Sequence, residues 1–282
     1  MPILKLKDIQ LEYREYGSGD RYLLCSQQDH KQVVNYTIDL AEKHGFHVFN
    51  ITIRGYGGST HIFEDLGDTF YDVWAQDTCD FADAMGIDKF FYTGVSHGAG
   101  IGWYLCVNHG DRLKGFFGIV AGPHSKDGAE TGEARMRTIR AAESQESWNA
   151  FCDEMEKNSK PVRKEGMTDK QWEIAQAVAA ERVACFRNMS LEEGRLNPRK
   201  PFPKQKSEEE LIAVLQTINV PTLLLGGMHD PISLPTNLLR SCGAVKNSKL
   251  ILYEDAGHGL DVEHKDEVVA DIMEFCRTRN LI

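Results

Sequence analysis

A serine between two glycines stands in the stretch FFYTGVSHGAG, which covers residues 90–100. Gly94 and Gly98 lie two residues before and after Ser96, so the chain can turn tightly there and hold the serine in a strained conformation. Such a turn would expose the hydroxyl at the end of a strand, where it is a candidate nucleophile. The alternative is a glycine-rich turn with a solvated serine, because a motif with three fixed positions also occurs by chance.

A serine hydroxyl needs two partners before it can attack a carbonyl group. A neutral imidazole must remove its proton, and an acceptor must hold the second imidazole nitrogen. His97 adjoins the serine, but we expect the turn to point its side chain elsewhere. We predict His258 as the base and Asp230 as its acceptor, because each follows a buried strand. The chain order Ser96, Asp230, His258 is also one that accompanies this kind of turn.

Two other acidic residues lie closer to His258 in the sequence. Asp255 and Asp261 would each need a local turn to bring the carboxylate to the imidazole, whereas Asp230 sits at the end of an adjacent strand. The competing interpretation is that Asp230 is a solvated loop carboxylate or a helix N-cap and that His258 is a structural loop residue, since most Asp and His residues have such roles.

The elements that must position these residues can be read from hydrophobic periodicity. Short β-branched and aromatic runs alternate with amphipathic segments, the pattern of a mostly parallel sheet covered by helices on both faces. We predict strands at residues 3–8, 9–17, 21–26, 46–53, 89–96, 113–122, 221–227 and 248–255, of which the first two have antiparallel character. We predict helices at 33–45, 71–86, 98–112, 235–245 and 266–280.

This alternation stops at Pro123. From residue 124 to 206 no segment has the pattern of a buried strand, and the stretches 133–157 and 168–189 have helical spacing. Residues 197–206 close the segment with proline and basic residues. The segment carries 16 Lys and Arg against 14 Asp and Glu, so its net charge is +2 while the rest of the chain carries −12. We interpret residues 124–206 as a helical insertion.

Taken together, these motifs resemble the α/β-hydrolase fold superfamily over nearly the whole chain. The stretch Arg54-Gly55-Tyr56-Gly57-Gly58-Ser59 is similar to the family's Arg-Gly-x-Gly-x-Ser turn after the fourth strand. The resemblance implies an α/β fold with a mostly parallel eight-stranded sheet flanked by helices. It also implies a hydrolase core at residues 1–123 and 207–282, a helical cap at 124–206 after the sixth strand, and a catalytic triad of Ser96, Asp230 and His258.

An enzyme that transfers acyl groups stabilises its oxyanion with two main-chain N–H groups. The resemblance implies that His97 supplies one and the loop after the third strand the other. Members of the family often have His-Gly before the second donor, whereas this chain has Ser26 and Gln27, which makes Gln28 the aligned donor. The missing glycine leaves the path of this loop open. Gln27 and the polar residues up to His30 are candidates for the pocket rim, although loops are polar by default.

The insertion supplies the remaining candidates for substrate contacts. Trp148 and Trp172 are the two that we select, together with the rim residue Gln27. At helical spacing such side chains are first of all the packing core of the insertion itself. The same holds for Phe151, Met155, Phe186 and Met189. Arg135, Arg137 and Arg140 could hold a substrate carboxylate, but a solvated helix face explains them more simply.

The chemistry that we expect is hydrolysis through an acyl-enzyme, with a carboxylic ester or lactone of a small, partly apolar molecule as the substrate. Three alternatives stay open, because one fold hosts many reactions. The first is a hydrolase that cleaves a carbon–carbon bond in a vinylogous diketone. The second is a cofactor-free dioxygenase on the same fold. The third is a ligand receptor with an intact-looking triad and little or no turnover.

Composition limits the partners and the compartment. The chain has 282 residues, 41% hydrophobic and 26% charged, with a formal charge of −10, which argues against nucleic acid or an anionic membrane as a partner. No stretch approaches the roughly 18 apolar residues of a membrane span, and the first residues lack a signal-peptide pattern. The seven cysteines and ten histidines show no metal-site spacing. We expect a cytoplasmic enzyme without a cofactor, and a homodimer stays open.

Overall fold

The computed structural model describes residues 2–28, 35–127, 133–163 and 166–282. His30 and its neighbour Asp29, which were predicted at the pocket rim, lie outside these ranges. The strands are β1 (Ile3–Lys5), β2 (Gln10–Tyr16), β3 (Tyr22–Gln27), β4 (His47–Thr52), β5 (Phe90–Val95), β6 (Leu113–Ile119), β7 (Thr222–Gly227) and β8 (Ser248–Tyr253). Each strand lies inside a predicted segment except β3, which runs one residue further, to Gln27, whereas β1 and β6 each end three residues before the predicted end.

The strands form one sheet with the order β1-β2-β4-β3-β5-β6-β7-β8. The pairs β1–β2 and β2–β4 are antiparallel, and every pair from β4 onward is parallel. In the central register Val95 lies opposite Ile119 and Ile119 opposite Leu225. The carboxyl ends of β5, β6, β7 and β8 therefore meet at one edge, which is where an open α/β sheet places its ligand site.

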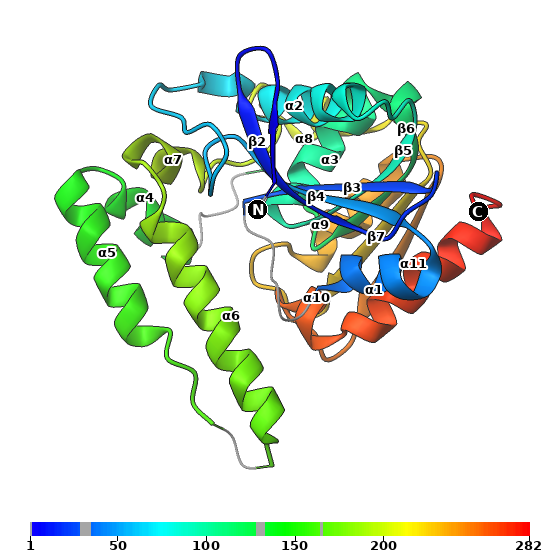
Figure 1. Ribbon diagram of the computed structural model, residues 1–282. Helices are drawn as coiled ribbons and strands as arrows, with labels where there is room; N and C mark the ends of the chain where they lie inside the picture. Colours follow the sequence, from blue (N-terminus) through cyan, green and yellow to red (C-terminus); the bar gives the residue numbers. More distant parts are fainter. Residues whose placement is uncertain (1, 29–34, 128–132, 164–165) are drawn as a thin grey trace.

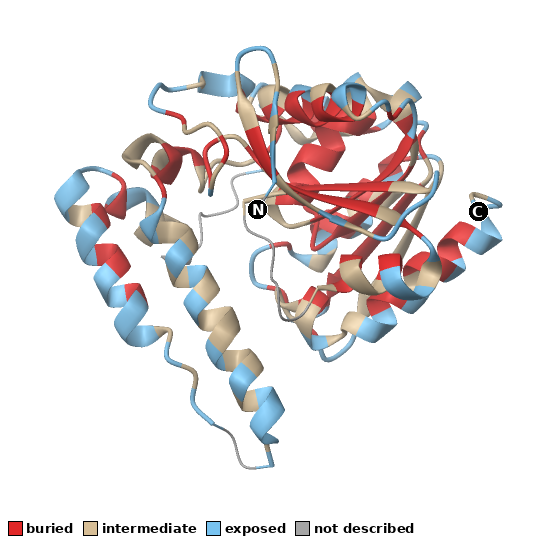
Figure 2. Cartoon of the chain, in the orientation of Figure 1, coloured by how far each residue is buried: buried red, intermediate tan, exposed pale blue. Residues whose placement is uncertain are grey.

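Helices cover both faces of the sheet (Figure 1). The core helices are α1 (Tyr36–His44), α2 (Phe70–Ala84), α3 (His97–Asn108), α8 (Glu208–Leu215), α9 (Pro235–Ala244), α10 (Leu260–Glu263) and α11 (Lys265–Thr278), with short 3-10 turns at Gly67–Thr69 and Gly110–Arg112. One buried cluster joins the sheet to α2, α3, α8 and α9, and a second joins it to α1 and α11. Figure 2 shows the buried residues concentrated in the sheet and α3.

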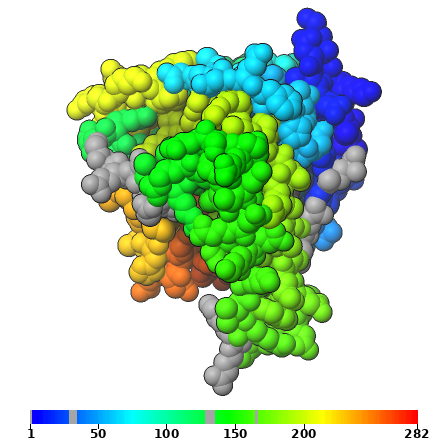
Figure 3. Space-filling model, turned by 90° about the vertical axis from the view of Figure 1, so that its left-hand side faces the viewer, coloured from blue at the N-terminus to red at the C-terminus, as the bar shows by residue number. Residues whose placement is uncertain are grey.

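The insertion contains α4 (Glu133–Ala141), α5 (Gln145–Asn158), α6 (Asp169–Arg187) and α7 (Leu191–Leu196). Figure 3 looks onto this part of the molecule and shows the green and yellow-green insertion in front of the orange and red C-terminal segments. The stretch 133–157 is not one helix, because Ser144 and Ser147 form a capping box that starts α5 anew. The N-cap Ser207 with three following glutamates marks α8, a signal that the sequence analysis missed.

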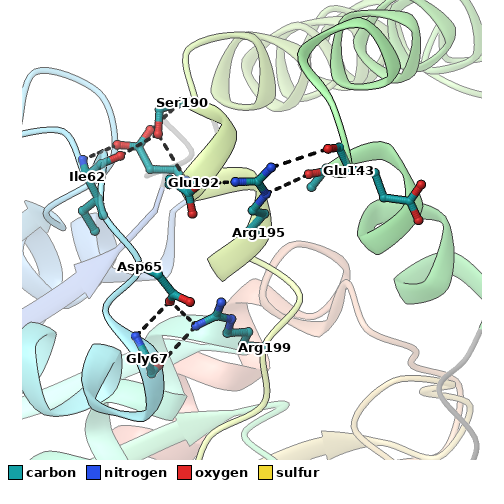
Figure 4. A network of polar contacts seen from close by, with 10 residues as sticks. Ile62, Asp65, Gly67, Glu143, Ser190, Glu192, Arg195 and Arg199 are labelled. Atoms are coloured by element: carbon teal, nitrogen blue, oxygen red, sulfur yellow. Dashed lines mark hydrogen bonds and ion pairs between the residues drawn. The ribbon is translucent and has the colours of Figure 1, made fainter.

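A network of polar contacts ties α7 to the core and to α4 (Figure 4). Glu193 is fully buried, and its carboxylate accepts hydrogen bonds from the main-chain N–H of Ile62 at 2.7 Å and of Ser190 at 2.6 Å. Arg195 donates to the main-chain oxygen of Ala142 at 3.0 Å. Arg199 donates to Asp65 at 2.7 Å, and this contact lowers the pKa of the Asp65 carboxyl. The segment after α7 is thereby fixed over the carboxyl edge of the sheet.

Candidate active site

Ser96 occupies the turn between β5 and α3 in a conformation that few side chains adopt. Its backbone angles are φ 50° and ψ −101°. The glycines on either side make this turn possible. A Cβ atom on Gly94 would lie 2.3 Å from the main-chain carbon of Gly98, and one on Gly98 would lie 2.1 Å from the Oε1 atom of Gln27. The sequence motif is therefore a steric requirement of the strand-to-helix turn, as predicted.

The three predicted triad residues lie together at the carboxyl edge of the sheet. The Nε2 atom of His258 is 3.0 Å from the Oγ atom of Ser96. The Nδ1 atom of the same ring is 2.8 and 3.0 Å from the two carboxylate oxygens of Asp230. A neutral imidazole in this position donates from Nδ1 to the carboxylate and accepts from the serine hydroxyl at Nε2. The arrangement can move a proton from the serine to His258.

Asp230 is held in place by its own loop. It is 2% exposed, and its Oδ1 atom accepts hydrogen bonds from the main-chain N–H groups of Ile232 at 2.8 Å and Ser233 at 2.9 Å. These donors stabilise the charged carboxylate. The alternative Asp255 forms an ion pair with His264 at 3.3 Å instead. The carboxylate that faces His258 is thus the one on the adjacent strand end.

His97 points its side chain away from the serine proton, as the sequence analysis expected. Its ring packs against Trp74, with ring centroids 4.7 Å apart, and against Tyr71 at 5.5 Å. Neither ring nitrogen has a hydrogen-bond partner among the described residues, and burial lowers the pKa of His97 to about 3. Its main-chain N–H opens α3, where no intrahelical acceptor exists. The amide of His97, not its imidazole, is the group available to a substrate oxyanion.

The loop after β3 uses its glutamine side chains for the protein itself. Gln27 donates from Nε2 to the main-chain oxygen of Val95 at 3.0 Å and accepts at Oε1 from the N–H of Val95 at 3.3 Å. Both polar atoms of Gln27 are therefore occupied, against the predicted contact with a substrate. The side-chain amide of Gln28 donates to the Tyr56 hydroxyl at 3.1 Å and to Asn197 of the cap. The main-chain amide of Gln28 stays a predicted oxyanion donor.

Tyr56 belongs to the turn after β4, which several buried contacts stabilise. Arg54 forms a bidentate pair with Asp77, at 3.0 and 2.5 Å, and its main-chain oxygen accepts from the Trp74 indole at 2.9 Å. Burial raises the pKa of the Asp77 carboxyl even though Arg54 opposes the shift. The buried Glu12 accepts from the N–H of Gly58 at 2.5 Å. The Arg-Gly-x-Gly-x-Ser turn thus has a structural role beside the site.

A cavity of about 60 Å³ adjoins Ser96. Its walls come from the end of β6, the start of the insertion, α4 and the segment after α7. The residues that line it are Tyr71, Ser96, His97, Val120, Ala121, Gly122, Pro123, His124, Arg135, Asn197, Arg199, Pro201 and Ser233. Compared with the roughly 150 Å³ that accommodates a benzene molecule, this space suits a short acyl group.

The two tryptophans selected from the sequence do not line this cavity. Trp148 is 1% exposed and packs inside the cap, with ring centroids 5.5 Å from Phe151 and 6.1 Å from Phe186. The prediction that Trp148 contacts a substrate is therefore wrong. Its helical spacing reflects the packing core of the insertion. Trp172 is half-buried on α6. A second hollow of about 750 Å³ lies between α6 and Val262 of α10 and does not include the triad.

Arg135 is the unexpected member of the cavity wall. Its Nη2 atom donates to the Nε2 atom of His124 at 2.9 Å, and its Nη1 atom is buried without a hydrogen-bond partner among the described residues. Burial lowers the pKa of His124 to about 3, and the charge of Arg135 acts in the same direction. Arg137, two residues on, instead pairs with the exposed Glu154 at 3.0 Å. The solvated helix face predicted for Arg135, Arg137 and Arg140 fits the last two but not Arg135.

Sequence reasoning missed most of the other side chains on the cavity wall. Tyr71, His124, Asn197 and Ser233 come from four separate segments, and none carries a motif. Asn197 follows a capping-box helix, and this placement is its only signal. Among the described residues, no group of three or more His, Cys, Asp or Glu side chains is placed to hold a metal ion. No helix in the described part of the chain is both long and apolar enough to cross a membrane.

Comparison with known proteins agrees with this architecture. The family model of the alpha/beta hydrolase fold matches residues 29–143, a stretch that includes Ser96 and ends before Asp230 and His258. A search of curated proteins found no match.

Solved structures match over nearly the whole chain. The enol-lactonase from Burkholderia xenovorans LB400 is 20% identical, with a TM-score of 0.72, covering 97% of this chain and 99% of its own. A thermophilic esterase from Thermogutta terrifontis is 20% identical, with a TM-score of 0.71 and coverage of 96% and 94%. The bromoperoxidase from Bacillus anthracis is 20% identical, with a TM-score of 0.73 and coverage of 95% and 96%. At these identities the matches establish the shared fold.

Proposed function

We propose that this chain, a member of the alpha/beta hydrolase fold superfamily, is a serine hydrolase that cleaves a carboxylic ester or lactone of a small molecule. The observation that carries the proposal is the continuous contact from the Ser96 hydroxyl through the His258 ring to the buried Asp230 carboxylate, at 3.0 and 2.8 Å. This geometry matches what a serine needs to become a nucleophile.

The proposed reaction has two halves. His258 takes the proton of Ser96 as the hydroxyl oxygen attacks the carbonyl carbon, and the oxyanion that forms is stabilised by the main-chain N–H groups of His97 and Gln28. The imidazolium then gives its proton to the leaving alcohol, and an acyl-enzyme remains. Water attacks the acyl carbon with His258 again as the base, and Ser96 recovers its proton as the acid leaves. Asp230 holds the imidazole orientation and stabilises its cation in both halves.

Two observations favour an ester or lactone of small size. The cavity beside Ser96 holds about 60 Å³, which admits a short acyl group. Solved structures with the same fold include an enol-lactonase and an esterase, although the bromoperoxidase shows that other reactions occur on this fold as well. The reaction uses only side chains and main-chain groups of this chain, and we propose no cofactor. We also propose that the enzyme acts in the cytoplasm.

The test is covalent labelling of Ser96 by a fluorophosphonate, combined with turnover of p-nitrophenyl acetate and butyrate. We expect labelling and turnover in the wild type and neither in Ser96→Ala. Ser190→Ala is the matched control, because Ser190 lies in the cap and its hydroxyl donates to the main-chain oxygen of Ile62. An unlabelled Ser96 in a folded protein would refute the proposal. Oxygen uptake without labelling would point to the dioxygenase alternative, and tight binding without product to the receptor.

A further inference from the structure

Positive charge gathers around the cavity of a chain whose net charge is −10. Arg135 and Arg199 line the cavity, and the charges of Arg135, Lys200 and Lys126 all act on the wall residue His124. The pKa of Lys126 is lowered by burial and then by Lys200, and the pKa of Lys200 is lowered by burial and then by Arg135. Neighbouring cations repel one another, and a bound anion stabilises their charged forms. The cationic segments all belong to the insertion, which has a net charge of +2.

Most guanidinium groups near the cavity already have a partner. Arg199 donates to the carboxylate of Asp65 at 2.7 Å, and Arg240 lies 3.4 Å from the carboxylate of Glu208. Arg240 also donates to the main-chain oxygen of Pro123 at 2.5 Å. These two arginines are therefore neutralised by the protein itself.

Arg135 differs from them. Its hydrogen-bond partner is the His124 ring, which accepts at Nε2 and is therefore neutral. Burial lowers the pKa of the Arg135 guanidinium. The Tyr71 hydroxyl opposes that shift, but no carboxylate among the described residues does. The buried Nη1 atom has no hydrogen-bond partner among those residues, and whereas Nε and Nη1 of Arg240 share this feature, Arg240 has the Glu208 carboxylate 3.4 Å away. In this half-buried guanidinium, an enclosed N–H group without an acceptor is costly unless a ligand supplies one.

We propose that Arg135 binds a carboxylate of the substrate, so that the substrate is a short ester or lactone carrying a carboxylate besides the carbonyl group that Ser96 attacks. This inference rests on the proposed hydrolase function. Arg135 and Ser96 line one cavity of about 60 Å³, so only a few bonds can separate the two groups. Half-esters of short dicarboxylic acids have this spacing. The planar guanidinium fork, with one N–H held by His124, leaves its other edge for a carboxylate.

His124 is a positioning residue in this arrangement. Its acceptor nitrogen fixes the Arg135 side chain at the cavity, and it stays neutral at physiological pH because burial lowers its pKa to about 3. A charged histidine there would repel the guanidinium. We therefore expect His124→Ala to raise KM for a carboxylate substrate by a larger factor than KM for a neutral ester.

The test compares two p-nitrophenyl esters of similar size, the hemisuccinate and the butyrate. In the wild type we expect kcat/KM to favour the hemisuccinate by about 10- to 100-fold, the range for hydrogen bonds to charged groups. Arg135→Gln should lose this preference, mainly through a higher KM for the hemisuccinate. Arg135→Lys should restore part of it, since it keeps the charge without the fork. Arg137→Gln, on the exposed face of the same helix, is the matched control.

Fluorophosphonate labelling of each variant separates the two proposals. If Ser96 is labelled and turns over the butyrate, but the wild type shows no preference for the hemisuccinate, or Arg135→Gln keeps that preference, the carboxylate site is refuted and the hydrolase stands. If Ser96 is unlabelled in the wild type, the hydrolase is refuted first.

A measurement on the wild type keeps the inference testable should Arg135→Gln fail to fold. Succinate should slow the labelling of Ser96 at concentrations where the neutral succinamide does not. Equal effects of the two compounds would overturn the assignment. Stronger protection by inorganic phosphate than by succinate would also overturn it, because the site would then select a tetrahedral anion.

Discussion

The side-chain amide of Gln27 binds both main-chain polar groups of Val95, the residue immediately before Ser96. The two contacts replace the main-chain hydrogen bonds that a neighbouring strand would make with Val95. The Oε1 atom of Gln27 also fills the space that a Cβ atom on Gly98 would need. The glycine that relatives often have at this position could make no such contact. Gln27 therefore acts on the nucleophile through the backbone that holds it.

Replacing Gln27 with alanine should lower kcat about 10-fold with a smaller change in KM, because the serine loses its fixed position relative to His258. The comparison is Gln28→Ala, which removes the contact with Asn197 of the cap and should act mainly on KM. Steady-state kinetics on a p-nitrophenyl ester distinguishes the two patterns. A Gln27→Ala variant with lowered thermal stability and unchanged kcat would show that the contact is only structural.

Asp230→Asn should reduce kcat by about 10³- to 10⁴-fold, since an amide in place of the carboxylate favours the wrong imidazole tautomer. Asp255→Asn is the matched control, because Asp255 is exposed and pairs with His264. Turnover of p-nitrophenyl butyrate, together with fluorophosphonate labelling, measures both. Similar losses in the two variants would contradict the assignment of the acid.

The two half-buried histidines beside the cavity should make folding sensitive to acid. His97 and His124 each have a folded pKa of about 3, below the 6.5 of an ordinary imidazole, so the unfolded chain takes up protons first as the pH falls. Their contribution to the free energy of unfolding is complete above about pH 6.5. It falls between that pH and about 3 by up to about 1.4 kcal/mol per pH unit for each histidine.

Denaturant unfolding at pH 7, 6 and 5 measures this slope. In His97→Phe the ring still packs against Trp74 and Tyr71, but one titrating group is gone. We expect the difference in unfolding free energy between pH 6 and pH 5 to shrink by about 1 kcal/mol relative to the wild type. An unchanged slope would mean that His97 is protonated freely in the folded protein.

Glu193→Gln should loosen the attachment of α7 to the core. The Glu193 carboxylate accepts hydrogen bonds from Ile62, Ser190 and His61. The glutamine NH₂ group would face at least one of these N–H donors and could not accept from it. We expect a loss of about 1–3 kcal/mol in unfolding free energy and faster cleavage of the cap by trypsin. The neighbouring Glu192→Gln should have a small effect, because Glu192 is more exposed and pairs with Arg195. Equal protease sensitivity in both variants would argue against the anchoring role.

The sequence was informative wherever one residue type answers a local steric or chemical need. Gly94 and Gly98 are fixed by the clash that a Cβ would cause, and Ser96, Asp230 and His258 stand at strand ends that hydrophobic runs reveal. The strands could therefore be predicted.

Contacts between distant segments could not be predicted in this way. Arg135 resembles Arg137 in the sequence, and only the fold encloses an N–H group of the first and pairs the second with Glu154. Gln27 looked like a polar rim residue because nothing local shows that its amide meets Val95. Trp148 was indistinguishable from a pocket residue, since helical spacing gives the same pattern for both.

Helix α6 packs on α5 but is only loosely held by the rest of the described chain. None of its 19 residues is buried, whereas α7 and the segment after it are tied to the core by Glu193 and Arg199. We therefore expect the residues of α6 to be under weaker selection than the residues that line the cavity. Over evolution, we expect α6 to vary in sequence and length at little cost to the reaction. Changes in which substrates reach the catalytic residues should therefore arise first in this helix.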